Sequence, residues 1–138
     1  MWACPKCGVK LVSRGLSHSC GDFSVERFLR GKPRGLYDQF VRMIAACGPD
    51  EVAPAKTRVA FLTQVRFASV NRVGEDSIDV HLVLPRKLES GRFRKVEKLG
   101  KLYVHHLRIA APADFDAELQ SWVRASYREY GDREWLRG

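Results

Sequence analysis

The chain has 138 residues, of which 45% are hydrophobic, so it can bury the core of one domain. Its formal net charge is +8, and most of the excess lies in residues 51–110, with twelve Lys or Arg against six Asp or Glu. This excess of positive charge favours an anionic partner such as nucleic acid. The alternative is that the charge contributes only to solubility. No apolar run reaches the roughly 20 residues that span a bilayer, and no secretory signal is visible. We therefore expect a cytoplasmic protein without a membrane partner.

Three cysteines and one histidine lie close together at the start of the chain. Cys4 and Cys7 form a CxxC turn, and His18 and Cys20 follow shortly afterwards. Three thiolates and one imidazole suit tetrahedral zinc, and four protein ligands leave no open position for catalysis. We therefore predict a structural zinc ion in a zinc-ribbon-like segment over residues 1–22, whose folding energy comes from the metal. The alternative is that these cysteines are reduced thiols without a metal.

Two helices are predicted after this segment. Ser24 is a suitable N-cap for a short helix from Val25, which the glycine and proline of residues 31–33 end. A second helix is predicted over residues 33–46, with one apolar stripe. Cys47 falls on this stripe, which favours a buried thiol over a nucleophile.

A strand periodicity follows, because apolar and polar residues alternate. The links are short, so the strands are expected to pair antiparallel. If Val65 and Phe67 point to the core, Arg66 and Ala68 share the opposite face with Arg58 and Ala60. The predicted strands cover residues 56–62, 65–72, 77–84 and 102–109.

Three histidines on these strands are candidates for acid/base chemistry near neutral pH. His81 lies on the polar face of its strand, beside Asp79. Because the strand period is two, one of the adjacent His105 and His106 shares this face, and we expect His106. His81, His105 and His106 are therefore the candidate catalytic residues. The chain contains no GxSxG, Walker, HExxH or GxGxxG motif that would indicate a particular reaction.

Residues 85–101 form the most basic stretch of the chain and include two glycines and a proline. These residues predict a loop with a short helical turn. Arg92, Phe93, Arg94 and Lys95 could grip a phosphate backbone while the aromatic ring stacks on a base. The alternative is a long solvated loop.

A final helix is predicted from Pro112, with an apolar stripe that packs on the apolar face of the sheet. The order of elements indicates an α+β fold, with an antiparallel sheet of four to five strands and helices on one face. The expected organisation is a zinc-ribbon-like segment at 1–22, an α+β domain at 23–131 and a tail at 132–138.

Several stretches together resemble a bacterial family known as domain-of-unknown-function family 5655. They are MWACPKCGVK with HSCG, AKTRVAFLTQVRFASV, DVHLVLPRKL, RFRKVEKLG and VHHLRI, and they cover about residues 1–130. The resemblance implies a small α+β domain and, as in some members, a Cys/His-rich N-terminal segment. It implies no activity. Some members are fused to restriction-system modules, which favours a nucleic-acid setting by association only.

Two hypotheses for the function follow. The first is a zinc-containing module that binds an anionic partner, nucleic acid or a nucleotide-like ligand, without catalysis. The alternative is an enzyme that acts on a small anionic substrate with the histidines as acid and base. A solvent-facing polar sheet surface with neither role is also compatible with the pattern. The residues predicted to contact the ligand are Lys56, Arg58, Arg66, His81, Arg92, Phe93, Arg94, Lys95 and His106.

Overall fold

The computed structural model describes Trp2–Ala3, Lys10–Leu11 and residues 24–131. The two short segments are strands β1 (Trp2–Ala3) and β2 (Lys10–Leu11), which pair with each other. The main sheet contains β3 (Glu51–Pro54), β4 (Val59–Leu62), β5 (Arg66–Val73), β6 (Ile78–Leu84), β7 (Phe93–Leu99) and β8 (Leu102–Ile109). The helices are α1 (Val25–Phe28), α2 (Gly35–Ala45) and α3 (Ala117–Ala125), with a 3-10 turn η1 (Pro112–Asp114) and a π-helical turn η2 (Ser126–Gly131).

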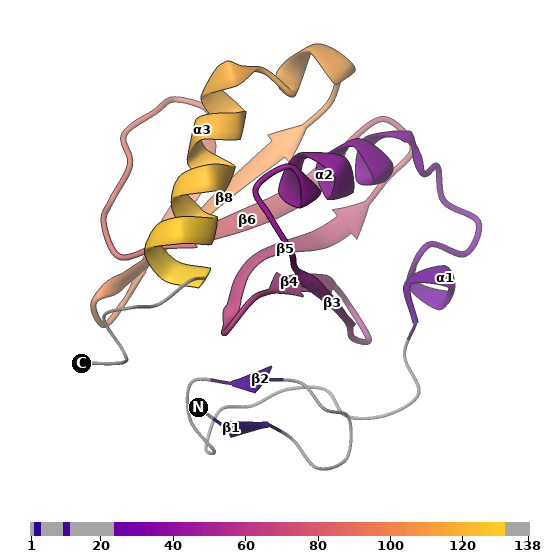
Figure 1. Cartoon of the computed structure of the whole chain (residues 1–138). Helices are drawn as coiled ribbons and strands as arrows, with labels where there is room; N and C mark the ends of the chain where they lie inside the picture. The colour runs from indigo at the N-terminus through magenta and orange to yellow at the C-terminus, as the bar shows by residue number, and fades with distance from the viewer. Residues whose placement is uncertain (1, 4–9, 12–23, 132–138) are drawn as a thin grey trace.

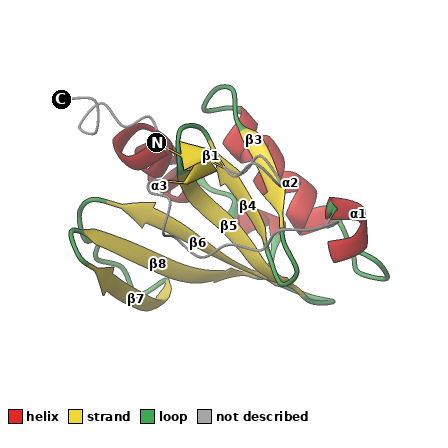
Figure 2. Cartoon of the chain, turned by 90° about the horizontal axis from the view of Figure 1, so that it is seen from below, coloured by secondary structure: helices red, strands yellow, loops and turns green. Residues whose placement is uncertain are grey.

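The main sheet is antiparallel throughout, in the order β3-β4-β5-β6-β8-β7. Helices α2 and α3 lie on one of its faces (Figures 1 and 2). The predicted α+β class with an antiparallel sheet is therefore confirmed, and the sheet has six strands instead of four to five. None of the helices in the described part of the chain is long and apolar enough to cross a membrane.

Helix α1 begins at Val25, as the sequence predicts, and α2 begins at Gly35, two residues after the predicted start. The hydroxyl of Ser24 accepts a hydrogen bond from the Arg27 N–H at 3.0 Å, which caps α1. Helix α2 buries Phe40 and Ile44 completely. Cys47 is half-buried, and burial is the largest cause that raises its pKa, so it behaves as a packed thiol.

The last predicted helix is divided into three parts. The Asp114 carboxylate accepts hydrogen bonds from the N–H groups of Ala110 and Ala111, which ends β8 in a tight turn. Asp116 then caps α3 by accepting from the Leu119 N–H at 2.9 Å. A second cap two residues after the first turn therefore starts a separate helix.

Both edge strands are missing from the prediction. Strand β3 is short and ends in Pro54, and β7 lies in the stretch that was predicted to be a loop. An edge strand pairs on one side only and exposes much of its surface, so its hydrophobic alternation is weak. Gly100, with φ at +64°, lies in the tight connection to β8.

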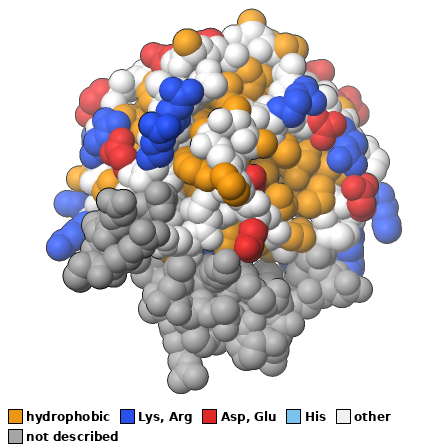
Figure 3. All heavy atoms as spheres, in the orientation of Figure 1, with side chains coloured by type: hydrophobic (Ala, Val, Ile, Leu, Met, Phe, Trp, Pro, Cys, Tyr) orange, Lys and Arg blue, Asp and Glu red, His pale blue; other side chains and the backbone are white. Residues whose placement is uncertain are grey.

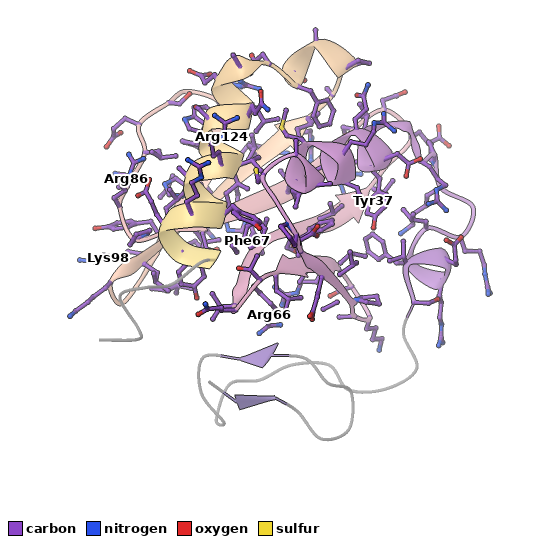
Figure 4. All side chains as sticks on the ribbon, in the orientation of Figure 1. Tyr37, Arg66, Phe67, Arg86, Lys98 and Arg124 are labelled. Atoms are coloured by element: carbon purple, nitrogen blue, oxygen red, sulfur yellow. The ribbon has the colours of Figure 1, made fainter. Side chains whose placement is uncertain are left out.

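Strand β5 contains an extra residue that reverses one predicted orientation. Phe61 pairs with Ala68 and Leu62 with Arg66, so Phe67 has no partner in β4. The prediction that Ala68 shares a face with Arg66 is therefore wrong. Ala68 lies with Phe61 on the helix-covered face, because a β-bulge places one additional residue in the strand. Figure 4 shows Phe67 on the side of α3 and Arg66 on the opposite side.

Candidate functional site

The face of the sheet turned away from α2 and α3, called the open face here, carries a row of charged side chains. Arg72 pairs with Asp79 across β5 and β6, and Asp79 pairs with Arg108 across β6 and β8. Directly opposite residues in a sheet project on the same side, so these three side chains meet. The open face therefore has a continuous charged row over three strands.

Three arginines surround the Asp79 carboxylate and form what we call the arginine cluster: Arg72, Arg94 and Arg108. Nε of Arg72 and Nε of Arg108 each lie 2.8 Å from an Asp79 oxygen, and Arg94 Nη1 lies at 4.0 Å. The hydrogen bond from Arg108 is the largest cause that lowers the pKa of Asp79. The arginine side chains are 42–56% exposed, so much of their donor surface faces solvent.

Two bulges increase the number of polar side chains on this face. Asn71 has no partner between the pairs Val70–Val80 and Arg72–Asp79, and Arg94 has none between Phe93 and Lys95. A bulge re-aims side chains, which is why strand alternation alone did not reveal Arg72 as part of the site. Arg108 could have been predicted on the open face, because it lies two residues after His106 in the same strand.

A second row lies next to the arginine cluster. Ser69 pairs with His81, His81 with His106, and His106 with Lys95. The rings of His81 and His106 are 5.5 Å apart. The prediction that His106, and not its neighbour, lies beside His81 is confirmed by this register.

Hydrogen bonds fix the tautomer of His81. The Ser69 hydroxyl donates to Asn71 Oδ1 at 2.9 Å, and Asn71 Nδ2 donates to His81 Nδ1 at 2.9 Å. Burial is the largest cause that lowers the pKa of His81 to about 3, ahead of repulsion from His106, Arg58 and Arg66. His81 is therefore neutral at physiological pH, with Nδ1 unprotonated.

His106 is held by a carboxylate on the neighbouring strand. Its Nε2 donates to Glu97 Oε1 at 2.7 Å, and Lys95 Nζ lies 3.6 Å from Glu97 Oε2. The hydrogen bond from His106 is the largest cause that lowers the pKa of Glu97. One ring nitrogen of each histidine is therefore hydrogen-bonded to a protein side chain, Asn71 for His81 and Glu97 for His106.

His105 occupies a different environment from His81 and His106. It is completely buried on the helix-covered face, opposite Leu82. Its Nε2 accepts the Leu88 N–H at 2.9 Å, and its Nδ1 lies 3.3 Å from the Leu82 carbonyl, to which it donates. With both nitrogens bonded to backbone, His105 connects the β6–β7 loop to the sheet and does not join the open face.

Arg92 and Phe93, which the sequence assigned to ligand contact, also pack against the helix layer. Arg92 Nη1 lies 3.0 Å from Asp116 and 3.1 Å from Glu118, and its guanidinium lies over the Trp122 ring. The Phe93 ring lies 4.7 Å from that of Trp122. These contacts tie the β6–β7 loop to α3, so we leave both residues out of the candidate site.

Of the remaining predicted contacts, Arg66 lies in β5 opposite Leu62, on the open face. Arg58 precedes β4 and is exposed, and Lys56 lies in the exposed link between β3 and β4. In the view of Figure 3, basic and acidic side chains are interspersed. The arginine cluster is the group of basic side chains that contacts between β5, β6, β7 and β8 bring together at Asp79.

The predicted zinc ligands Cys4, Cys7, His18 and Cys20 lie outside the described residues. Within the part of the chain that the structure describes, no group of three His, Cys, Asp or Glu side chains is arranged to hold a metal ion. The four predicted ligands therefore remain a prediction from their chemistry and spacing.

The fold and the open face define a small α+β domain whose antiparallel sheet has helices on one side. Residues 25–129 match the family described as "Domain of unknown function (DUF5655)". The chain belongs to this family, as the resemblance implied, and the match begins after the Cys/His-rich segment. No curated protein and no solved structure matches the chain.

Proposed function

We propose that the open face binds a phosphate-bearing partner, nucleic acid or a nucleotide-like ligand, without catalysing a reaction on it. The observation that carries this proposal is the arginine cluster, in which three guanidinium groups share the single carboxylate of Asp79. The cluster keeps an excess of positive charge and is about half exposed. Guanidinium groups match phosphate oxygens in fork geometry, so they suit this ligand better than lysine would.

The carboxylate of Asp79 supports binding because it orients the cluster in advance. Arg72 is fixed by Asp79 and by a 2.9 Å hydrogen bond to the Ser77 hydroxyl, and Arg108 makes two contacts with Asp79. Side chains that are already ordered lose less conformational entropy when a ligand arrives. Arg94 is held less tightly, at 4.0 Å, and can turn toward a phosphate.

The chemistry of the histidines supports binding over catalysis. A general base works best with a pKa near the operating pH, whereas the pKa of His81 is lowered to about 3. Asn71 and Glu97 each occupy one nitrogen of the His81–His106 pair. We therefore assign His81 and His106 to the shape and polarity of the face.

We further propose that Cys4, Cys7, His18 and Cys20 hold a structural zinc ion. Three thiolates and one imidazole fit tetrahedral zinc, which would supply folding energy to a segment too short for its own core. Metal analysis of the purified protein should find about one zinc per chain. Cys4→Ser should lose the metal while the domain after Ser24 stays folded, and persistence of the metal would exclude this ligand set.

The binding proposal is tested by fluorescence anisotropy with a labelled single-stranded oligonucleotide, as DNA and as RNA, from about 50 to about 200 mM salt. We expect the wild-type affinity to fall as salt rises, because phosphate contacts release counterions. The variant R72Q/R94Q/R108Q should reduce the slope of log K against log salt by about 2, at about 0.7 per contact to a single strand.

The matched control removes the same charge elsewhere. R30Q/R42Q/R124Q changes three exposed arginines outside the sheet and should keep most of the wild-type slope. R94Q alone is the mildest test, because Arg94 makes the longest contact with Asp79. Equal losses in the two triple variants, or no wild-type binding at low salt, would contradict the proposal.

A further inference from the structure

Some side chains on the open face are buried, although α2 and α3 lie on the other face of the sheet. Five side chains from β4, β5, β6 and β8 show this: Ala60 is 4% exposed, Leu62 2%, Ser69 1%, Val83 8% and Val104 8%. The register places Ala60 opposite Ser69, in the row that carries His81, and Val83 opposite Val104, two residues further along β6. Valine and leucine on a sheet face without a second layer would be considerably more exposed.

The closure is confined to one half of the face. The arginine cluster, at the other end of the same strands, has side chains that are 42–56% exposed. The burial that lowers the pKa of His81 agrees with this boundary, since His81 lies between the two halves. Something other than the described helices therefore covers the half that contains Leu62, Val83 and Val104.

We infer that the N-terminal segment, residues 1–23, docks on this half of the open face and forms the second layer there. Strands β1 and β2 lie on the side of the sheet opposite α2 and α3 in both views (Figures 1 and 2). In Figure 4, Arg66 lies between the sheet and these two strands. The segment is joined to the domain at Ser24, the cap of α1, so it belongs to the same chain as the face.

Size and composition favour this segment over the other end of the chain. The closed half extends over four strands and is roughly 14 Å wide, because neighbouring strands lie about 4.8 Å apart. The 23 residues before Ser24 offer enough chain for this width and include the apolar residues Trp2, Val9, Leu11 and Leu16. Residues 132–138 contain fewer large apolar side chains, Trp135 and Leu136.

The cover has a consequence for recognition. It closes the half of the face that contains Leu62, Val83 and Val104, and it leaves the arginine cluster as the accessible end. The same segment carries the predicted zinc ligands.

The docking is tested with the full chain by site-specific photocrosslinking. p-Benzoylphenylalanine replaces Arg66, which lies on the covered side, and in the control it replaces the exposed Arg42 in α2. After irradiation, mass spectrometry of the monomer identifies the linked peptide. We expect the probe at 66 to link to residues 1–23 of the same chain and the probe at 42 not to do so.

The inference would be overturned if the probe at 66 links to no peptide of residues 1–23, for example if it links only to residues 132–138. Links found only between chains would also overturn it. If replacement of Arg66 prevents folding, as judged by circular dichroism, the probe is placed at the exposed Arg58, beside Ala60 on the same side. The same outcomes then decide. Because the readout contains no ligand, it is independent of whether the arginine cluster binds phosphate.

Discussion

Replacement of His81 by glutamine should reduce the acid sensitivity of the fold. His81 is neutral in the folded protein, because burial lowers its pKa from 6.5 to about 3. In the unfolded chain it takes up a proton near its ordinary pKa. As pH falls below about 6.5, the unfolded state therefore binds more protons than the folded state, and the free energy of unfolding decreases. His81→Gln keeps an oxygen that can accept the Asn71 hydrogen bond and removes the titration.

The magnitude follows from the two pKa values. At about 1.4 kcal/mol per pKa unit, His81 alone lowers the free energy of unfolding by about 2 kcal/mol between about pH 7 and about pH 5. The decrease continues until pH approaches about 3, where the folded state is protonated as well. Burial also lowers the pKa of His105, which adds to the acid loss in both proteins and cancels in the comparison.

The assay is urea unfolding followed by circular dichroism, for wild type and His81→Gln at both pH values. Only the pH-dependent difference is compared, so a uniform change in stability caused by the substitution does not matter. We expect the variant to lose about 2 kcal/mol less than wild type on acidification. Equal losses in the two proteins would refute the reasoning that His81 is neutral in the folded protein.

Two core predictions concern the layer under the helices. Ser126→Ala should lower the free energy of unfolding by about 1–3 kcal/mol, because the buried hydroxyl lies 2.8 Å from the Phe67 carbonyl and 2.7 Å from the Val83 carbonyl, which would lose this donor. Ser121→Ala on the exposed side of α3 is its control and should change stability little. Phe40→Ala should cost about 3–5 kcal/mol, since the ring is completely buried, and a loss under about 1 kcal/mol would contradict this packing.

The sequence predicts the centre of this fold better than its edges. Strand β8 has the predicted bounds, Leu102–Ile109, because its two sides differ clearly in polarity. Strand β7 escapes prediction, since as an edge strand it carries charge on both sides. The Ala68 orientation fails for a different reason: a bulge depends on the pairing with β4, which strand periodicity does not encode.

The candidate site was predicted in part. The pairing of His81 with His106 follows from parity alone, and the register confirms it. Arg72 was missed because a bulge in β5 changes its orientation, whereas Arg108 was missed although its parity with His106 places it on the same face. Phe93 was placed in a free loop, whereas it packs on Trp122 once β7 joins the sheet.

The central claim is that the exposed end of the open face receives a phosphate-bearing partner. The most direct measurement is a two-dimensional NMR titration of the nitrogen-labelled protein with a single-stranded oligonucleotide, repeated at higher salt. The account predicts the largest shift changes at Arg72, Asp79, Arg94 and Arg108, and their reversal as salt rises. Changes confined to α2 and α3, or no changes at low salt, would contradict it.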